Sequence, residues 1–243
     1  MKERSELKIL GIDTSTTAFS ICVFEDNKIL YELRCERAFI NDQKDAGLFS
    51  AIQKLLNNME NETIDGIALS IGPGMFTSLR VGLALAQGLY FSRNIPLCGV
   101  NTLDVIAHSF YLLDLVNKGK NIICASVMEA FRGEVFVAFY NHGAKIDQDM
   151  VFNPGALINF IERNFKNKKI IAIGPGVKIL AGHKMKKNAK NKLYIINSHL
   201  FHPSASKVVY TAFSKIKTGD FDDPENLEPY YIKKTSAEQR GKK

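Results

Sequence analysis

The side chains that could do metal or nucleophilic chemistry are scattered through this sequence of 243 residues. The five histidines form no HxxxH pair, and the four cysteines form no CxxC pair. His199 and His202 could bring two imidazoles together, but no neighbouring cysteine completes a zinc site. No GxSxG turn presents a serine, and no base is placed for Ser70, Ser78 or Cys98. The sequence therefore predicts no metal site and no catalytic residue.

The most informative stretch is Ile64–Tyr90, which reads as a covered strand, a tight turn and a helix. The turn is Gly72-Pro73-Gly74, because glycine permits a positive φ and proline fixes one turn angle. Thr77 or Ser78 is expected to cap the helix that follows.

The helix that follows this turn is unusually apolar. From Val81 to Phe91 its one strongly polar side chain is Gln87. A helix that is apolar all round is buried all round, and its own sheet can cover one side only. Two interpretations stay open: the helix is enclosed by its own domain, or its second side binds a partner.

Five motifs, in order, resemble those of the bacterial TsaB (YeaZ) family. IGPGMFTSLRVGLALAQGL is similar to the family signature GPGSFTGLRIGLATAKGLA. ILGIDTST resembles the opening strand and turn, IPLCGVNTL resembles IPLVGVSTL, FRGEVF resembles RRGEVY, and PYYIK resembles the closing PxYLR. The five motifs run nearly from one end of the chain to the other.

The resemblance implies a role in making threonylcarbamoyladenosine, the modified adenosine beside the anticodon of many tRNAs. TsaB-like proteins pair with TsaD, which transfers the threonylcarbamoyl group from threonylcarbamoyl-AMP, and a TsaE-like ATPase is a third member. The resemblance further implies contact with tRNA through the complex and a homodimer when TsaD is absent. A small-molecule kinase or ATPase remains the alternative function, and direct tRNA binding by the chain alone is a third.

The order of the expected elements suggests two related α/β lobes, at residues 1–104 and 105–243, with the last helix and tail free to pack back on the first lobe. KIIAIGPG at Lys169–Gly176 repeats IALSIGPG at Ile67–Gly74, which favours an internal duplication. Duplicated strand meanders are typical of the actin-like, sugar-kinase and heat-shock-protein ATPase fold, which the resemblance also implies. The expected strands are 7–13, 18–24, 28–37, 96–100, 121–127, 135–140 and 145–152, with helices from about 41, from 103 to 115 and from 154 to 165.

In that fold a nucleotide binds between the lobes, so four residues are candidates for nucleotide contact: Asp13, Thr14, Ser15 and Gly174. A phosphate hairpin commonly needs a glycine for close approach, and Ser15 stands where related ATPases usually have one. The second turn carries the bulky Phe131. The hairpins therefore look degenerate, so no cofactor is expected to be required, although an adenine nucleotide could bind in the complex.

The expected partner face combines the helix after Thr77 with the preceding helix. Its predicted members are Phe49, Gln53, Leu56, Gly82, Ala84, Leu85 and Gly88. Two pairs of small residues one turn apart, Gly82 with Ala86 and Ala84 with Gly88, would let another backbone come close. Which side of the helix faces outward cannot be read from periodicity when the helix is this apolar.

Composition is that of a soluble protein, with 46% hydrophobic residues and no run long enough to span a bilayer. Scattered cysteines suit a reducing cytosol, so a cytoplasmic location without membrane contact is expected. The formal net charge is +7. Late lysines at 166, 168, 169, 178, 184, 186, 187, 190 and 192, with the KKTSAEQRGKK tail, could meet tRNA phosphates. A solvated surface is favoured instead, because arginines and aromatics are not interleaved with them.

Overall fold

The computed structural model describes residues 7–36, 47–58, 63–113, 121–183 and 192–232. The chain divides into two compact units, one made of residues 1–102 and 203–230, the other of residues 103–202 and 231–243. The N-terminal segment of the first unit therefore ends at Thr102. A second segment from near the C-terminus, which contains the last helix, completes this unit. Among the described residues no helix is long and apolar enough to cross a membrane.

The first unit holds a five-stranded sheet in the order β3-β2-β1-β4-β5. Its strands are β1 (Lys8–Asp13), β2 (Ala18–Glu25), β3 (Lys28–Glu36), β4 (Gly66–Gly72) and β5 (Leu97–Asn101). The first three pair antiparallel, and β1, β4 and β5 run parallel. The meander expected from the sequence is confirmed with bounds that differ by one residue at most.

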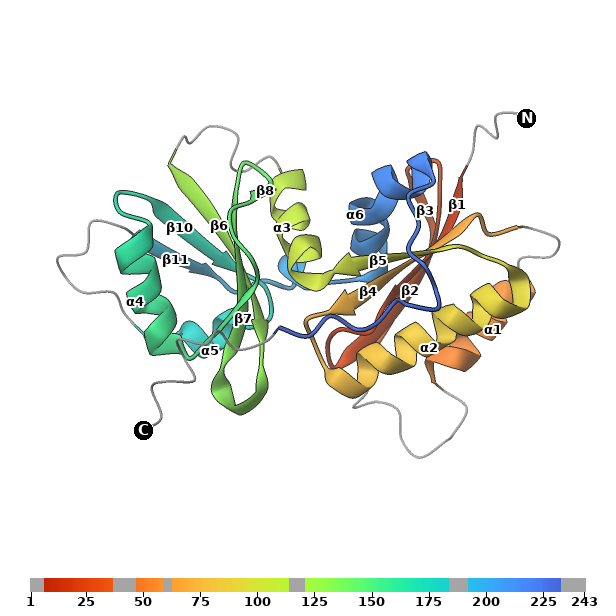
Figure 1. The fold of residues 1–243 in the computed structure, drawn as a ribbon, viewed down its shortest axis with the longest axis horizontal. Helices are drawn as coiled ribbons and strands as arrows, with labels where there is room; N and C mark the ends of the chain where they lie inside the picture. The colour runs from red at the N-terminus through yellow and green to blue at the C-terminus, as the bar shows by residue number, and fades with distance from the viewer. Residues whose placement is uncertain (1–6, 37–46, 59–62, 114–120, 184–191, 233–243) are drawn as a thin grey trace. The chain divides into compact units, whose positions relative to one another are not determined.

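Helices cover this sheet on both faces, with α1 (Leu48–Asn58) and α2 (Phe76–Arg93) on one and α6 (Ala205–Thr218) on the other (Figure 1). Alternation along β1 explains the arrangement. Leu10 and Ile12 join the core beneath α1 and α2, whereas a Cβ on Gly11 would lie 2.6 Å from the Ala205 carbonyl oxygen of α6. Every residue of β1 is therefore buried.

The second unit repeats the first sheet, in the order β11-β10-β6-β7-β8. Its strands are β6 (Ile122–Glu129), β7 (Val135–Asn141), β8 (Ala144–Lys145), β9 (Met150–Phe152), β10 (Lys169–Ile173) and β11 (Lys192–Ile196). Again a meander precedes parallel strands. The duplicated actin-like α/β fold is thereby confirmed. The single strand predicted over residues 145–152 is wrong, since β8 and β9 pair separately with β7.

The helices of the second unit are α3 (Thr102–Leu112), α4 (Pro154–Asn164) and the short α5 (Val177–Leu180), with 3-10 turns η2 (Phe131–Gly133) and η3 (His199–Phe201). The side chains of α3 pack in the core of the second sheet. Each half of the sequence thus contributes its last helix to the other half's sheet, α3 to the second and α6 to the first. The sequence left room for the last helix to pack back on the first lobe, and the boundary predicted at residue 104 placed most of α3 in the second lobe.

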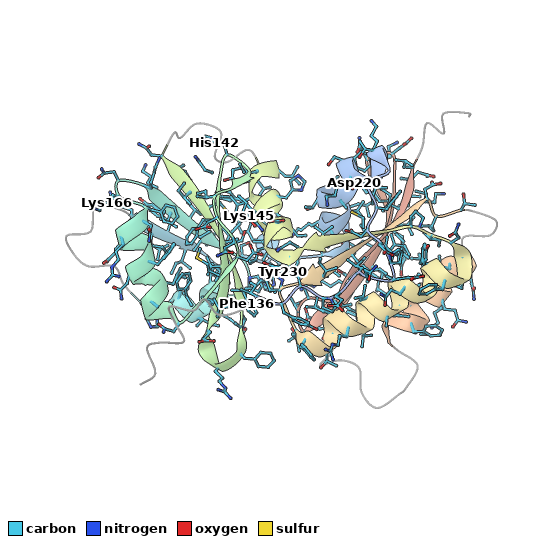
Figure 2. All side chains as sticks on the ribbon, viewed as in Figure 1. Phe136, His142, Lys145, Lys166, Asp220 and Tyr230 are labelled. Carbon is cyan, nitrogen blue, oxygen red and sulfur yellow. The ribbon has the colours of Figure 1, made fainter. Side chains whose placement is uncertain are left out.

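A polar network fastens α3 to the second sheet. The Asp104 carboxylate accepts hydrogen bonds from the Tyr140 hydroxyl at 2.6 Å and the Lys145 ammonium at 2.7 Å. Lys145, which Figure 2 labels, also contacts the Asp149 carboxylate at 2.8 Å. Burial, followed by the charge of Asp104, raises the pKa of the Tyr140 phenol, so Tyr140 remains a hydrogen-bond donor.

Candidate functional site

The two Gly-Pro-Gly turns occupy matching strand-to-helix junctions. Gly72 ends β4 with φ +120° and Gly174 follows β10 with φ +105°, both in the region that favours glycine. A Cβ on Gly174 would lie 2.5 Å from the Val127 carbonyl oxygen, so the residue is occupied by packing within its own unit. Gly174 therefore allows the chain to turn tightly between β10 and α5.

The expected phosphate hairpin after β1 is closed by its own hydrogen bonds. The Asp13 carboxylate, 2% exposed, accepts the backbone N–H of Ser15 at 3.2 Å and the Ser15 hydroxyl at 2.7 Å. The Thr14 N–H donates to the Ser70 hydroxyl at 3.2 Å. Burial raises the pKa of Asp13, and bonds from Ser70 and Ser15 oppose that rise. Two of the hairpin N–H groups that a phosphate would need are thus already used inside the protein.

The turn before α2 packs directly against this hairpin. Met75 donates its N–H to the Ser15 carbonyl at 2.9 Å, and a Cβ on Gly74 would overlap that same carbonyl. Three of the four predicted nucleotide residues, Asp13, Thr14 and Ser15, therefore lie together in a buried cluster, while Gly174 belongs to the second unit.

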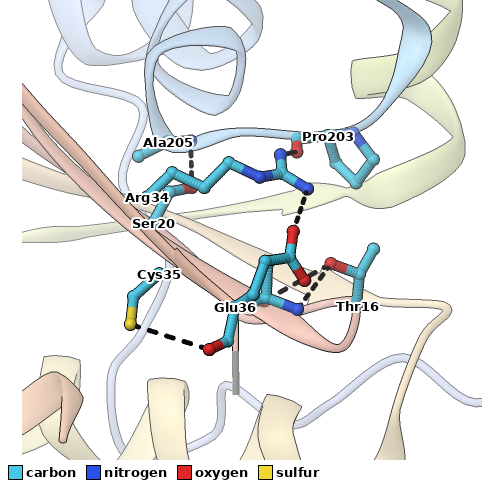
Figure 3. Close-up of polar contacts among 8 residues, drawn as sticks. Thr16, Ser20, Arg34, Cys35, Glu36, Pro203 and Ala205 are labelled. Carbon is cyan, nitrogen blue, oxygen red and sulfur yellow. Dashed lines mark hydrogen bonds and ion pairs between the residues drawn. The ribbon is translucent and has the colours of Figure 1, made fainter. Parts of the chain in front are cut away.

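The start of α6 is held by side chains of β2 and β3. Ala205 donates its N–H to the Ser20 hydroxyl at 2.8 Å, and the Arg34 guanidinium donates to the Pro203 carbonyl at 3.2 Å (Figure 3). Glu32 accepts the N–H and hydroxyl of Ser206. Sequence reasoning missed this cluster, because its partners are more than 160 residues apart.

One side of α2 is buried and the other is not. Its buried residues are Ser78, Leu79, Gly82, Leu83 and Ala86. The prediction that Gly82 belongs to the partner face is wrong, because a Cβ there would lie 2.5 Å from the Thr14 hydroxyl oxygen. Gly82 instead allows the helix to approach the β1–β2 hairpin. The predicted cap is wrong as well, since the helix begins at Phe76 with Met75 as N-cap and no side-chain cap.

The opposite side of α2 presents an apolar stripe to solvent. Val81 is 47% and Phe91 64% exposed, with the small exposed residues Ala84 and Gly88 between them. Their spacing of three or four residues places them on one helix face. No heavy atom lies within 4 Å of a Cβ built on Gly88. Ala84 and Gly88 are therefore the exposed small residues among those predicted, and Leu85 is half-buried.

Helix α1 adds a second exposed surface on the same side of the sheet. Leu48, Ile52 and Leu55 pack in the core that Leu83 and Ala86 of α2 also enter. Phe49 is 64% exposed, Gln53 is exposed and Leu56 is half-buried. The predicted start of this helix near Asn41 lies outside the described residues. We call Val81, Ala84, Gly88, Phe91 and Phe49 the exposed helix face.

Gln87, the one strongly polar residue between Val81 and Phe91 of α2, has a structural role. The Gln87 amide donates to the Pro224 carbonyl at 2.7 Å and to the Leu227 carbonyl at 3.4 Å. Both carbonyls lie in residues 220–230, the C-terminal strap, which also pairs with β5 at Asp222 and with β4 at Tyr230 (Figures 1 and 2). An isolated amide in an apolar helix was the signal that could have revealed this contact.

Within the described residues no group of three or more His, Cys, Asp or Glu side chains could hold a metal. The rings of His199 and His202 lie 4.6 Å apart beside Pro203. Phe131 of the η2 turn is 74% exposed. Glu129, at the end of β6, forms an ion pair with Lys178 at 2.9 Å. Lysines at 184, 186, 187 and 190 and the tail from residue 233 lie outside the described chain.

Comparison with known proteins agrees with this fold. A family described as "TsaD: tRNA N6-adenosine threonylcarbamoyltransferase" matches residues 46–238. The chain is similar to the "tRNA threonylcarbamoyladenosine biosynthesis protein TsaB" of Buchnera aphidicola (subsp. Schizaphis graminum), with 28% identity over 85% of this chain and 93% of the relative. The protein of the same name from Bacillus subtilis is 22% identical over 96% and 97%.

The structure titled "YeaZ from Pseudomonas aeruginosa" has the same fold, with a TM-score of 0.69 and 22% identity over 93% of this chain and all of that one. Fold, family match and relatives agree along most of the chain. The chain belongs to the threonylcarbamoyltransferase family described above and, within it, to the TsaB (YeaZ) group.

Proposed function

We propose that this chain takes part in forming tRNA threonylcarbamoyladenosine as a non-catalytic subunit that pairs with a TsaD-type threonylcarbamoyltransferase. The names of its full-length relatives support the pathway. The observation that carries the subunit role is the exposed helix face, an apolar stripe with small residues at its centre. Exposed contiguous apolar surface is characteristic of protein–protein interaction sites.

The closed hairpin supports the absence of intrinsic catalysis. Asp13 is buried and hydrogen-bonded to Ser15, and the Ser15 carbonyl accepts a hydrogen bond from the Met75 N–H. A magnesium-bound nucleotide would need these groups to be released. We therefore infer that the chain needs no cofactor of its own, that any adenine nucleotide is held with the help of a partner, and that a TsaE-like ATPase and tRNA join through the complex in the cytoplasm.

The small residues of the exposed helix face suit close packing against another helix. Without the transferase, the same face is proposed to pair two copies of this chain. Ala84 and Gly88 would let a partner backbone approach, while Phe91 and Phe49 supply the apolar area.

The test replaces Gly88 with glutamate and compares it with Gly182→Glu in the second unit. Both glycines are exposed, and neither Cβ would meet a heavy atom within 4 Å. Gly88→Glu should fold normally, yet lose association with a TsaD-type protein by at least about a hundredfold, because it places an unpaired charge in a packed contact. Gly182→Glu should associate normally.

Association is measured by co-purification and by calorimetry, and activity by a tRNA modification assay in which each component is left out in turn. Unchanged association of Gly88→Glu would refute the proposed face. Modification without this chain would refute the subunit role. Magnesium-dependent ATP turnover by the pure chain, abolished by Asp13→Ala, would favour the kinase or ATPase alternative instead.

A further inference from the structure

The two units differ in net charge. The second unit, residues 103–202 and 231–243, carries 19 lysines and arginines against 8 aspartates and glutamates, a net charge of +11. The first unit carries 13 against 17, a net charge of −4, and the two values account for the +7 of the whole chain. A basic excess confined to one unit favours a negatively charged partner for that unit.

Part of this excess lies at one edge of the second sheet, where β10 meets β11. Lys169 and Lys192 begin these two parallel strands and are direct neighbours in the pairing register. Residues paired in register point to the same face, and neighbouring strands lie about 4.8 Å apart, so the two side chains leave the sheet close together. Both are exposed. Like charges in such neighbouring positions repel each other, and a bound anion relieves that repulsion.

The turn before β10 adds two more lysines and holds its own backbone in place. Lys166, which Figure 2 labels, is exposed, and Lys168 is half-buried. The Lys168 N–H donates to the Phe165 carbonyl at 3.1 Å, and the Lys168 carbonyl accepts the Lys192 N–H at 3.2 Å. The Lys168 ammonium also donates to the Asn121 side chain at 3.4 Å. Because this backbone is already ordered, a ligand that binds its lysines has less ordering cost to overcome.

These four lysines differ from others in the same unit in having no acidic partner. Lys145 and Lys178 form ion pairs with carboxylates. Among the described residues, no ion pair involves any member of the lysine patch, by which we mean Lys166, Lys168, Lys169 and Lys192. The positive charge of the lysine patch is therefore available to an anion from outside the chain.

An aromatic ring lies beside the lysine patch. Tyr194 follows Lys192 by two residues on β11, which places it on the same face of the sheet, and it is 46% exposed. Exposed rings next to cations are what proteins use to hold unpaired bases and their phosphates. The interpretation of the late lysines as a plain solvated surface rested on a lack of interleaved aromatics, and Tyr194 is an interleaved aromatic.

We propose that the lysine patch and Tyr194 form an RNA-binding surface, in which the lysines contact phosphates and Tyr194 stacks on an unpaired base. RNA is favoured over an acidic protein because neighbouring lysines beside a flat ring match the two parts of a nucleotide, its phosphate and its base. This assignment rests on the proposed function, in which tRNA joins the complex, and gives part of the tRNA contact to the second unit.

The experiment titrates the full-length chain into a fluorescent anticodon stem-loop RNA and follows anisotropy at several salt concentrations. Lys169→Gln combined with Lys192→Gln should weaken binding by about tenfold. It should also reduce the slope of log affinity against log salt by about 1.5–2, since two phosphate contacts are lost. The matched control is Lys215→Gln with Lys217→Gln, two exposed lysines of α6 in the first unit. It changes the net charge equally and should leave the slope unchanged.

Tyr194 is tested by two substitutions. Tyr194→Ala should weaken binding of the stem-loop by about tenfold with an unchanged salt slope, because stacking on a ring releases no counterions. Tyr194→Phe should bind like the natural protein. A fully paired RNA of the same length should not respond to Tyr194→Ala, since its bases are stacked on one another. If thermal unfolding shows that Tyr194→Ala does not fold, the variants at the exposed lysines decide.

Equal losses in the two lysine pairs, or no measurable binding of the stem-loop, would overturn the RNA-binding surface. Equally tight binding of poly-glutamate or of phosphatidylserine vesicles would also overturn it, in favour of an acidic protein or a membrane. Gly88→Glu separates this result from the proposed function. It should bind the stem-loop normally while losing the transferase, and the Lys169 and Lys192 variant should do the reverse, so either proposal can fail alone.

Discussion

Ser15 donates both its backbone N–H and its hydroxyl to one oxygen of Asp13, at 3.2 and 2.7 Å. The pair turns a carboxylate that the fold could use for chemistry into an internal hydrogen-bond acceptor. Because burial raises the pKa of Asp13, this acceptor is held at a cost to the folded state when it is ionised.

Asp13→Asn should therefore make the protein more stable at neutral pH. Between the ordinary pKa of 3.8 and the raised folded value, the native state binds more protons than the unfolded state, so the free energy of unfolding falls as pH rises. Each pKa unit corresponds to about 1.4 kcal/mol. Asparagine retains an acceptor for Ser15 without the charge.

Urea unfolding of both proteins from pH 4 to pH 7.5 measures this difference, and other acids cancel in the comparison. The advantage of Asp13→Asn should grow with pH. A variant that becomes relatively less stable as pH rises would mean that the ionised carboxylate is favoured by its surroundings.

Two glycines of α2 should respond in opposite ways to alanine. Gly88→Ala should stabilise the monomer by about 0.5–1 kcal/mol, because alanine is the better helix former and its Cβ meets nothing within 4 Å. Gly82→Ala should destabilise it by about 1–3 kcal/mol, since its Cβ would lie 2.5 Å from the buried Thr14 hydroxyl. Thermal unfolding of the two variants decides, and equal effects would contradict the assignment of the helix faces.

Gln87→Met should loosen the C-terminal strap while keeping the volume of the side chain. The lost hydrogen bonds to the Pro224 and Leu227 carbonyls predict a cost of about 1–2 kcal/mol. Hydrogen exchange should quicken at Asp222 and Tyr230, whose N–H groups pair with β5 and β4. Protection of β10 in the second unit serves as the internal control, and unchanged exchange at Tyr230 would show that the strap is held without Gln87.

Lys207→Met should make the free energy of unfolding depend less on pH above about pH 7. Burial first, then repulsion from Arg34, lowers the pKa of Lys207 from 10.5 to about 8. Between these values the unfolded state binds more protons, so the free energy of unfolding of the natural protein should rise with pH. Unfolding at pH 7 to pH 10 compares this variant with Lys215→Met, at an exposed position of the same helix. An identical profile for both variants would contradict the prediction.

Most strands of the two sheets could be predicted because their signals are local, but β11 was not predicted, and β8 and β9 were predicted as one strand. Apolar runs bounded by glycine, proline and asparagine place β1, β2 and β4 almost to the residue, and the repeated Gly-Pro-Gly turn reveals the duplication. The faces of α2 could not be predicted, since a helix without polar periodicity contains no marker of orientation. Gly82 and Gly88 are both glycines within the same apolar stretch, and nothing in that stretch distinguishes them. In the structure they differ because Thr14 packs against Gly82, whereas no atom lies within 4 Å of a Cβ built on Gly88.

Long-range contacts account for most of what was missed. The bond between Gln87 and Pro224 spans 137 residues, and that between Ser20 and Ala205 spans 185. Neither partner carries a local pattern that names the other. Sequence therefore identified α2 as a candidate interaction element, whereas its exposed residues and its uncapped first turn required the structure.

The exchange of α3 and α6 has a consequence for how the protein is made. At the moment the ribosome has produced the fifth strand of the first sheet, at Asn101, the helix that will cover one side of that sheet is still more than 100 residues from being synthesised. The face of β1 that carries Ile9 and Gly11 stays uncovered until Val209 of α6 has been synthesised. A nascent chain released early would leave that apolar surface bare, so only completed molecules can close their first sheet.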